Sequence, residues 1–162
     1  HVLDHGIDLL HPPFWYVLWG MGLDSFWNPS GVGRNGYYSI LLAAYVIGRL
    51  CEAVFHSYGK CSIFAWRPFD SYFRLIAARR NPCLLLLTAS IVVGRPDLGL
   101  VAVATWTAAT TAVLAARLAY ARSLYATNGP LRSWLAEPVT AARDHPGAYR
   151  VFSVTRAAYP TG

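Results

Sequence analysis

Residues 37–58 read YYSILLAAYVIGRLCEAVFHSY, and this stretch decides the fold. Its apolar run supplies the roughly 20 helical residues that cross a bilayer core of about 30 Å. Three further apolar stretches lie at residues 3–23, 81–94 and 98–120. The stretch 81–94 is short, so it thins the bilayer, borrows residues from 76–80 or is buried among its neighbours. The sequence predicts an all-α, polytopic membrane protein with about four transmembrane helices.

The composition also favours lipid as the solvent. Hydrophobic residues make up 55% of the 162 residues and charged residues only 14%, with a mean hydropathy of +0.33. So few charges cannot coat a water-facing globule of this size. The net charge of +6 could indicate nucleic-acid binding, but the basic residues follow the two sides of the predicted membrane. We therefore expect no nucleic-acid partner.

The distribution of basic residues predicts the orientation. Eleven of the 14 Lys and Arg residues lie between the second and third spans or at the end of the fourth span and beyond, against two on the opposite side. Because cytoplasmic loops keep Lys and Arg, both segments and the N-terminal end of the first span are expected in the cytoplasm. The eleven are Lys60, Arg67, Arg74, Arg79, Arg80, Arg117, Arg122, Arg132, Arg143, Arg150 and Arg156, and the two are Arg34 and Arg95.

An amphipathic pattern stands between the second and third spans. Its apolar residues recur at i, i+3, i+4 and i+7, and they are Phe69, Tyr72, Phe73 and Ile76. Asp70 lies off this stripe, so the pattern predicts an amphipathic helix in the cytoplasmic interface. The tail is rich in Pro, Gly and Arg without clear periodicity. We expect a transmembrane helical domain over 1–126 and a cytoplasmic tail, surface-lying or extended, over 127–162.

Two carboxylates stand one helical turn apart at the start of the first span. Asp4 and Asp8 are four residues apart, which places both on one face of a helix. They repel each other unless a cation lies between them, and carboxylates with phosphate oxygens and water suit Mg²⁺ or Mn²⁺. The alternative is that both are solvated acids favoured by the helix dipole. We expect them to be metal ligands.

Basic residues beside the third span are candidates for binding a substrate phosphate or a lipid headgroup. They are Lys60, Arg67, Arg79 and Arg80. Guanidinium groups suit this role because their paired N–H donors fit phosphate. The alternative is that these residues only enforce topology. Arg79 and Arg80 are favoured because they stand at the positive N-terminal end of a helix.

The second span carries a polar face. Arg49, Glu52 and His56 stand at i, i+3 and i+7, so they share one side of the helix, and Arg49 can pair with Glu52 inside the membrane. This face either lines a polar cavity or forms a structural ion pair against another helix. The three cysteines, Cys51, Cys61 and Cys83, lack C-x-x-C spacing, which favours reduced thiols over a disulfide or a zinc site.

The opening HVLDHGID, residues 1–8, resembles the end of the CDP-alcohol phosphatidyltransferase signature, D-x2-D-G-x2-A-R-x8-G-x3-D-x3-D. In the favoured register Asp4 matches the final aspartate and Asp8 is an extra acid. In a second register Asp4 and Asp8 themselves form D-x3-D. The stretches RPFDSYFRLIAARRNP (67–82) and GRPDLGLVAVATWTA (94–108) also resemble bacterial members. Residue 1 is His, so we expect an N-terminal part to precede it. The resemblance implies that this part carries the first half of the signature, which is absent from residues 1–162.

The resemblance implies transfer of a phosphatidyl group from a CDP-linked lipid donor to an alcohol acceptor, with release of CMP, in a bacterial inner membrane. It implies divalent cations, Mg²⁺ or Mn²⁺, held by the signature aspartates only if the missing N-terminal aspartates are present, and Asp4 as the catalytic base. Two further spans would complete the family's six, and this portion alone is expected to be inactive. The alternative is a non-catalytic accessory subunit derived from this fold and packed in a larger membrane complex. The protein as a homodimer is a further alternative that the sequence leaves open.

Overall fold

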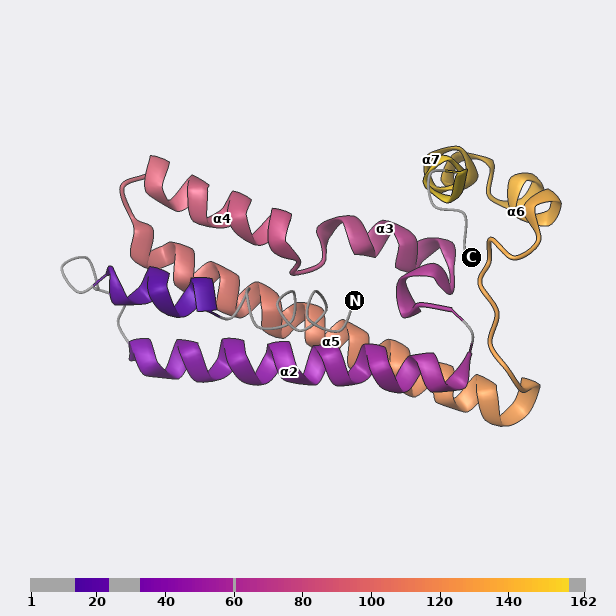
Figure 1. Cartoon of the computed structure of the whole chain (residues 1–162), viewed down its shortest axis with the longest axis horizontal. Coiled ribbons are helices and arrows are strands. Elements are labelled where there is room, and N and C mark those ends of the chain that lie inside the picture. Colours follow the sequence, from indigo (N-terminus) through magenta and orange to yellow (C-terminus); the bar gives the residue numbers. More distant parts are fainter. Residues whose placement is uncertain (1–13, 24–32, 60, 158–162) are drawn as a thin grey trace. The chain divides into compact units, whose positions relative to one another are not determined.

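The computed structural model describes residues 14–23, 33–59 and 61–157, with side chains up to residue 153. Helix accounts for 82% of these residues, and they hold no strand beyond an isolated bridge between Gly59 and Leu131. Helical residues 14–21 come first (Figure 1). The elements that follow are α2 (Arg34–Tyr58), the 3₁₀ helix η1 (Ile63–Ala65), α3 (Pro68–Ile76), α4 (Arg80–Val92), α5 (Pro96–Asn128), α6 (Pro138–Asp144) and α7 (Pro146–Ala157).

Three helical stretches are long and apolar enough to cross a membrane. They are Arg34–Tyr58, Pro68–Val92 and Pro96–Asn128. The all-α prediction is therefore confirmed for the described residues, and the apolar helices indicate a membrane protein. Most of the predicted first span, 3–23, lies outside the described residues, so four crossings stay a prediction.

The stretch from Pro68 to Val92 is interrupted at residues 77–79, and Pro82 explains the interruption. Its ring would clash with the carbonyl of Ala78 in a continuous helix, and it has no N–H to donate to that carbonyl. In the third position of α4 the missing N–H costs nothing, since it would have no partner within the helix. The Ala78 N–H donates instead to Thr110 Oγ1 of α5 at 3.0 Å.

Glycines with positive φ end two of the helices. Gly94 has φ of 74° and donates to Ile91 O at 2.8 Å, while Arg95 N donates to Ser90 O at 2.9 Å. This is the Schellman arrangement, which satisfies the last carbonyls of α4. Gly129, with φ of 77°, follows α5 and donates to Tyr125 O at 3.0 Å. Neither position accepts a Cβ without strain.

The structure divides into two compact units, His1–Arg49 with Ala77–Val113, and Leu50–Ile76 with Leu114–Gly162. In the first unit, apolar side chains of α2, α4, α5 and the helical residues 14–21 share one core. Its buried members are Tyr16, Leu23, Leu41, Cys83, Leu87, Leu100, Val103 and Ala104. Thr111 Oγ1 of α5 donates to Ala44 O of α2 at 2.8 Å, which adds a polar contact between two apolar helices.

The first unit also contains a close approach of α4 and α5 at Gly99. A Cβ built there would overlap Ser90 Oγ and lie 2.9 Å from Ser90 Cβ. Ser90 is held in place by its hydrogen bond to Leu87 O at 2.6 Å. The absence of a side chain at Gly99 is therefore what lets the two helices approach.

We expect Gly99→Ala to lower the free energy of unfolding by about 1–2 kcal/mol. Overpacking costs about 1–3 kcal/mol, whereas replacing a glycine inside a helix gains about 0.5–1 kcal/mol. Thermal or denaturant unfolding in detergent micelles measures the difference. Adding Ser90→Ala should recover part of the loss. Gly147→Ala in α7, where nothing lies within 4 Å of the added Cβ, is the matched control and should be neutral or stabilising.

In the second unit the tail is attached to η1 and α3 by hydrogen bonds. Trp134 Nε1 donates to Ser71 Oγ at 3.0 Å, and Ser133 Oγ donates to Ala65 O at 2.7 Å. Two helices, α6 and α7, follow within the predicted aperiodic tail, and a proline begins each of them. The tail is thus helical in part and not simply extended.

Candidate functional site

A buried ion pair joins α3 to α5 in the second unit. Arg117 Nε and Nη2 donate to the two carboxylate oxygens of Asp70, each at 2.7 Å. The side chains of Asp70 and Arg117 are 3% and 19% exposed. A bidentate pair of this kind is among the stronger charge-assisted contacts in proteins. The sequence pattern places Asp70 off the apolar stripe and Arg117 among the topology-setting cations, and it does not indicate that the two residues pair.

Aromatic rings surround the pair. The centre of the Arg117 guanidinium lies 4.7 Å from the ring of Trp66, 5.6 Å from Phe69 and 5.7 Å from Tyr120. Trp66 itself packs on Phe55 of α2, with the ring centroids 5.5 Å apart. Rings that face a cation stabilise it where water is excluded. The Arg117 charge is therefore held by one carboxylate and three rings.

Arg67 lies near two of these rings, and its side chain is exposed. Its guanidinium lies 5.0 Å from Trp66 and 5.2 Å from Tyr120, and Nη2 donates to the Tyr120 hydroxyl at 3.4 Å. The guanidinium groups of Arg67 and Arg117 thus lie near the same two rings, Trp66 and Tyr120. Asp70 supplies one negative charge against these two positive charges, so this region is locally cationic. Such a region can bind an anion such as phosphate.

Arg79 and Arg80 belong to the first unit, where they lie at the start of α4. Arg79 is the half-buried N-cap residue of α4, and Arg80, exposed, is its first helical residue. Both therefore stand at a helix N-terminus, as the sequence predicts. Lys60 lies outside the described residues. Phosphate binding by these residues stays a prediction.

The predicted polar face of the second span lies on α2. Arg49 and Glu52 are half-buried there, and His56 is exposed. The Arg49 guanidinium lies 5.7 Å from the Tyr45 ring. Whether this face lines a cavity or packs on another helix stays open, as it does from the sequence.

The predicted metal ligands, Asp4 and Asp8, lie outside the described residues. Within the described residues, no group of three or more His, Cys, Asp or Glu side chains is placed to hold a metal ion. The predicted cation site rests on Asp4, Asp8 and the signature aspartates expected upstream of them, and it stays a prediction. The carboxylate oxygens of Asp4 and Asp8 are ligands of the type that Mg²⁺ and Mn²⁺ prefer.

The three cysteines are free thiols. Cys51 and Cys83 are buried, and Cys61 is half-buried. Burial raises the pKa of the Cys61 thiol above its usual value. Because the thiolate is the reactive form, this shift lowers the reactivity of Cys61 at neutral pH.

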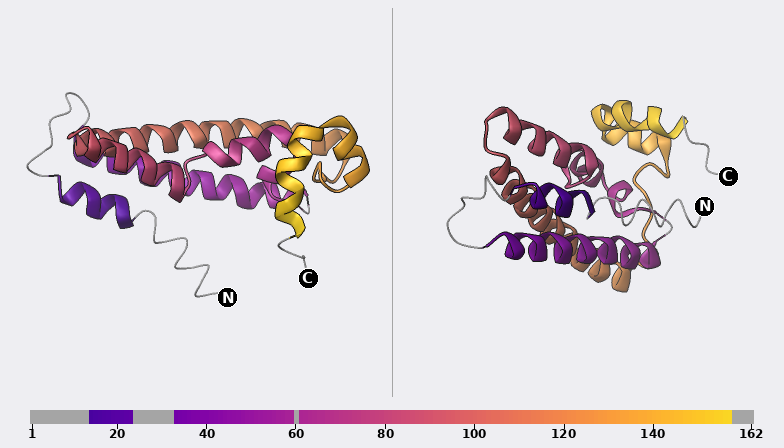
Figure 2. Two further views of the ribbon diagram at one scale, coloured as in Figure 1. Left: turned by 90° about the horizontal axis from the view of Figure 1, so that it is seen from above. Right: turned by 60° about the vertical axis from the view of Figure 1, so that its left-hand side comes forward.

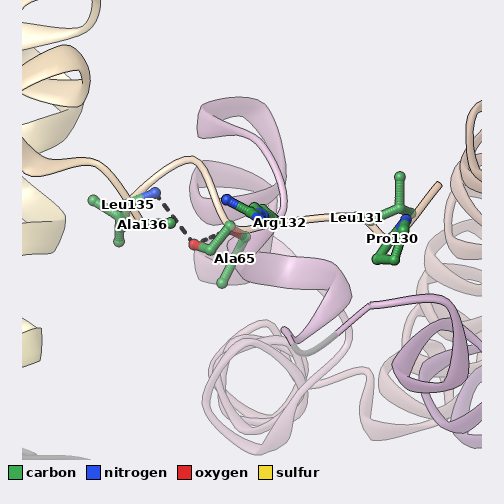
Figure 3. A pocket seen from close by; sticks show the side chains of 7 residues that line it. Ala65, Pro130, Leu131, Arg132, Leu135 and Ala136 are labelled. Atoms are coloured by element: carbon green, nitrogen blue, oxygen red, sulfur yellow. Dashed lines mark hydrogen bonds between the residues drawn. The ribbon is translucent and has the colours of Figure 1, made fainter. Parts of the chain in front are cut away.

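A hollow of about 590 Å³ lies beside η1 in the second unit (Figure 3). Ala65 and residues of the segment 130–136 line it, and Arg132 is the charged residue among them. Leu135 N donates to Ser133 Oγ at 3.2 Å along its wall. The lining offers few polar groups that could orient a ligand.

Comparisons with protein-family models, with characterised proteins and with solved structures find no match to this chain.

Proposed function

We propose that this chain is the C-terminal, membrane-embedded portion of a CDP-alcohol phosphatidyltransferase-like enzyme. The sequence stretches at residues 1–8, 67–82 and 94–108 carry that proposal through their resemblance to the family. The enzyme would transfer a phosphatidyl group from a CDP-linked lipid to an alcohol and release CMP. Divalent cations would neutralise the diphosphate of the donor. Asp4 would accept the proton from the attacking hydroxyl, and Asp8 would stand beside it as a second acid.

The exposed apolar surface of the helices supports the membrane part of the proposal. In α4 the side chain of Leu85 is 70% exposed and that of Val92 is 82% exposed. On α2 the exposed large apolar residues are Ile40, Leu42, Val46, Ile47, Leu50 and Val54. Burying one such side chain away from water gains about 1.5–3 kcal/mol, so faces of this size favour lipid. We propose four crossings, with α3 at the interface and with the acidic turn and the tail on the cytoplasmic side of a bacterial inner membrane.

The arginines would serve the charged parts of the substrates in this proposal. Arg79 and Arg80 stand at a helix N-terminus, and Arg67 stands in a locally cationic region. With Lys60, these residues are proposed to bind the phosphate of the acceptor or of lipid headgroups. The polar face at Arg49 and Glu52 would lie within the bilayer.

The second candidate is a non-catalytic accessory subunit of the same fold. The exposed apolar faces of α2 and α4 favour it as much as they favour lipid contact, because a larger membrane complex could cover them. This candidate needs neither a metal nor a base at Asp4.

The experiment that separates the two uses the intact protein in nanodiscs. With Mn²⁺, CDP-diacylglycerol and a panel of alcohols, the enzyme should release CMP, and a chelator should stop the release. Reading the residues encoded upstream of His1 should show D-x2-D-G-x2-A-R. An immediate start codon, together with no CMP release with any alcohol, would favour the accessory subunit.

A further inference from the structure

The amphipathic helix α3 has its polarity reversed relative to a helix of a water-soluble protein. Asp70 and Ser71 are buried, whereas Phe69, Leu75 and Ile76 are 58%, 59% and 55% exposed. The buried polar groups are satisfied, since Asp70 pairs with Arg117 and Ser71 Oγ donates to Phe64 O at 3.0 Å. Because its polar residues are buried, the outward face of α3 is apolar, and water is a poor solvent for it.

The C-terminal helix α7 extends this face. Tyr72 of α3 and Phe152 of α7 meet edge to face, with the ring centroids 5.1 Å apart. Figure 2 shows the ribbons of these two helices passing close to each other. Val151, next to Phe152, is 53% exposed. Exposed apolar side chains thus continue from α3 onto a helix that lies far along the chain. We call this the α3–α7 surface, and its exposed apolar members are Phe69, Tyr72, Leu75, Ile76 and Val151.

Positive charge accompanies the α3–α7 surface. Arg150 of α7 is exposed beside Val151, and the one acid on α3, Asp70, is buried in its pair with Arg117. Arg74 is exposed too, but it stands off the apolar stripe of α3. Among the described side chains of the second unit, seven arginines stand against four carboxylates. The arginines are Arg67, Arg74, Arg117, Arg122, Arg132, Arg143 and Arg150, and the carboxylates belong to Glu52, Asp70, Glu137 and Asp144.

We propose that the α3–α7 surface docks on anionic phospholipid headgroups, so that α7 holds the C-terminal tail on the bilayer. The apolar members enter the boundary between headgroups and acyl chains, and Arg150 contacts lipid phosphates. The exposed cations complement a negatively charged leaflet, whereas a neutral leaflet offers them no such attraction. The inference rests on the proposed membrane placement and adds to it the chemistry of the lipid and a role for the tail.

The test places an environment-sensitive probe on the full chain in nanodiscs. A Val151→Cys variant, in a background in which Cys61 is serine, is labelled with a bimane dye. Quenching by brominated lipid is then compared between discs of phosphatidylcholine alone and discs that also contain phosphatidylglycerol. We expect strong quenching with phosphatidylglycerol and several-fold weaker quenching without it. Arg150→Gln should reduce the preference for the anionic lipid about fivefold, whereas Arg74→Gln, off the apolar stripe, should change it less.

A probe at Val92→Cys is the matched control, because Val92 is exposed on α4 and outside the α3–α7 surface. It should be quenched equally in both kinds of disc. If Val92 is not quenched, the proposed membrane placement fails. If Val92 is quenched but Val151 is not, or if Val151 is quenched equally in both kinds of disc, the docking proposal is overturned while the membrane placement stands. Absence of quenching at Val151 would mean that this surface faces water or another protein.

Discussion

Replacing Asp70 with alanine is expected to lower the free energy of unfolding by about 3–5 kcal/mol, the usual loss when one partner of a buried ion pair is removed. The carboxylate is 3% exposed and accepts both donors of Arg117 at 2.7 Å. Without it the guanidinium stays among Trp66, Phe69 and Tyr120 with no anion to balance it. The rings offset only a small part of that charge's desolvation. Thermal or denaturant unfolding in detergent micelles measures the loss.

A matched set of variants separates the ion pair from simple packing. Asp70→Asn keeps the size of the side chain and removes its charge, so it should lose most of what alanine loses. The double variant Asp70→Leu with Arg117→Met removes both charges and should lie closer to the parent protein than either single variant does. If the losses of the single variants Asp70→Leu and Arg117→Met simply add in the double variant, the two side chains do not act as a pair.

The helices could be predicted from the sequence because their cause is local. The apolar run expected at 37–58 lies within α2, which begins at Arg34 and ends at Tyr58. The run expected at 98–120 lies within α5, but the helix continues to Asn128. Hydropathy measures how much of a helix suits the bilayer, whereas the helix itself ends at the positive φ of Gly129. The predicted span and the observed helix therefore end at different residues, because hydropathy reports the preferred solvent and backbone geometry sets where the helix ends.

The contacts between distant segments could not be predicted. Asp70 and Arg117 are 47 positions apart, and nothing in the local pattern of either residue names the other. The amphipathic pattern of α3 predicts an interfacial helix, but it does not show that Asp70 on the polar side is buried. The tail helices are not predicted from the sequence because α6 and α7 are short and stand in a stretch rich in Pro, Gly and Arg. Pro138 and Pro146, each at the first helical position, are the signals that would have indicated them.

The largest functional effect is expected from Asp4→Asn in the intact protein. Asparagine keeps the size of the side chain but cannot accept the proton of the attacking hydroxyl, and it is a weaker cation ligand. CMP release should fall by about 10²–10⁴-fold, the usual contribution of a positioned acid or base. The measurement is CMP release from CDP-diacylglycerol in nanodiscs at saturating Mn²⁺, with unfolding of the variant followed in parallel to show that it still folds.

Asp8→Asn turns this measurement into a choice between the two registers of the signature. If Asp4 is the final signature aspartate, Asp8 is an additional cation ligand one turn away, and its replacement should lower turnover less than that of Asp4 does. If Asp4 and Asp8 themselves form D-x3-D, both variants should be inactive, because each carboxylate is then an essential cation ligand. Full turnover in both variants contradicts both registers at once. The acids would then be solvated groups at a helix N-terminus, where the helix dipole alone favours them.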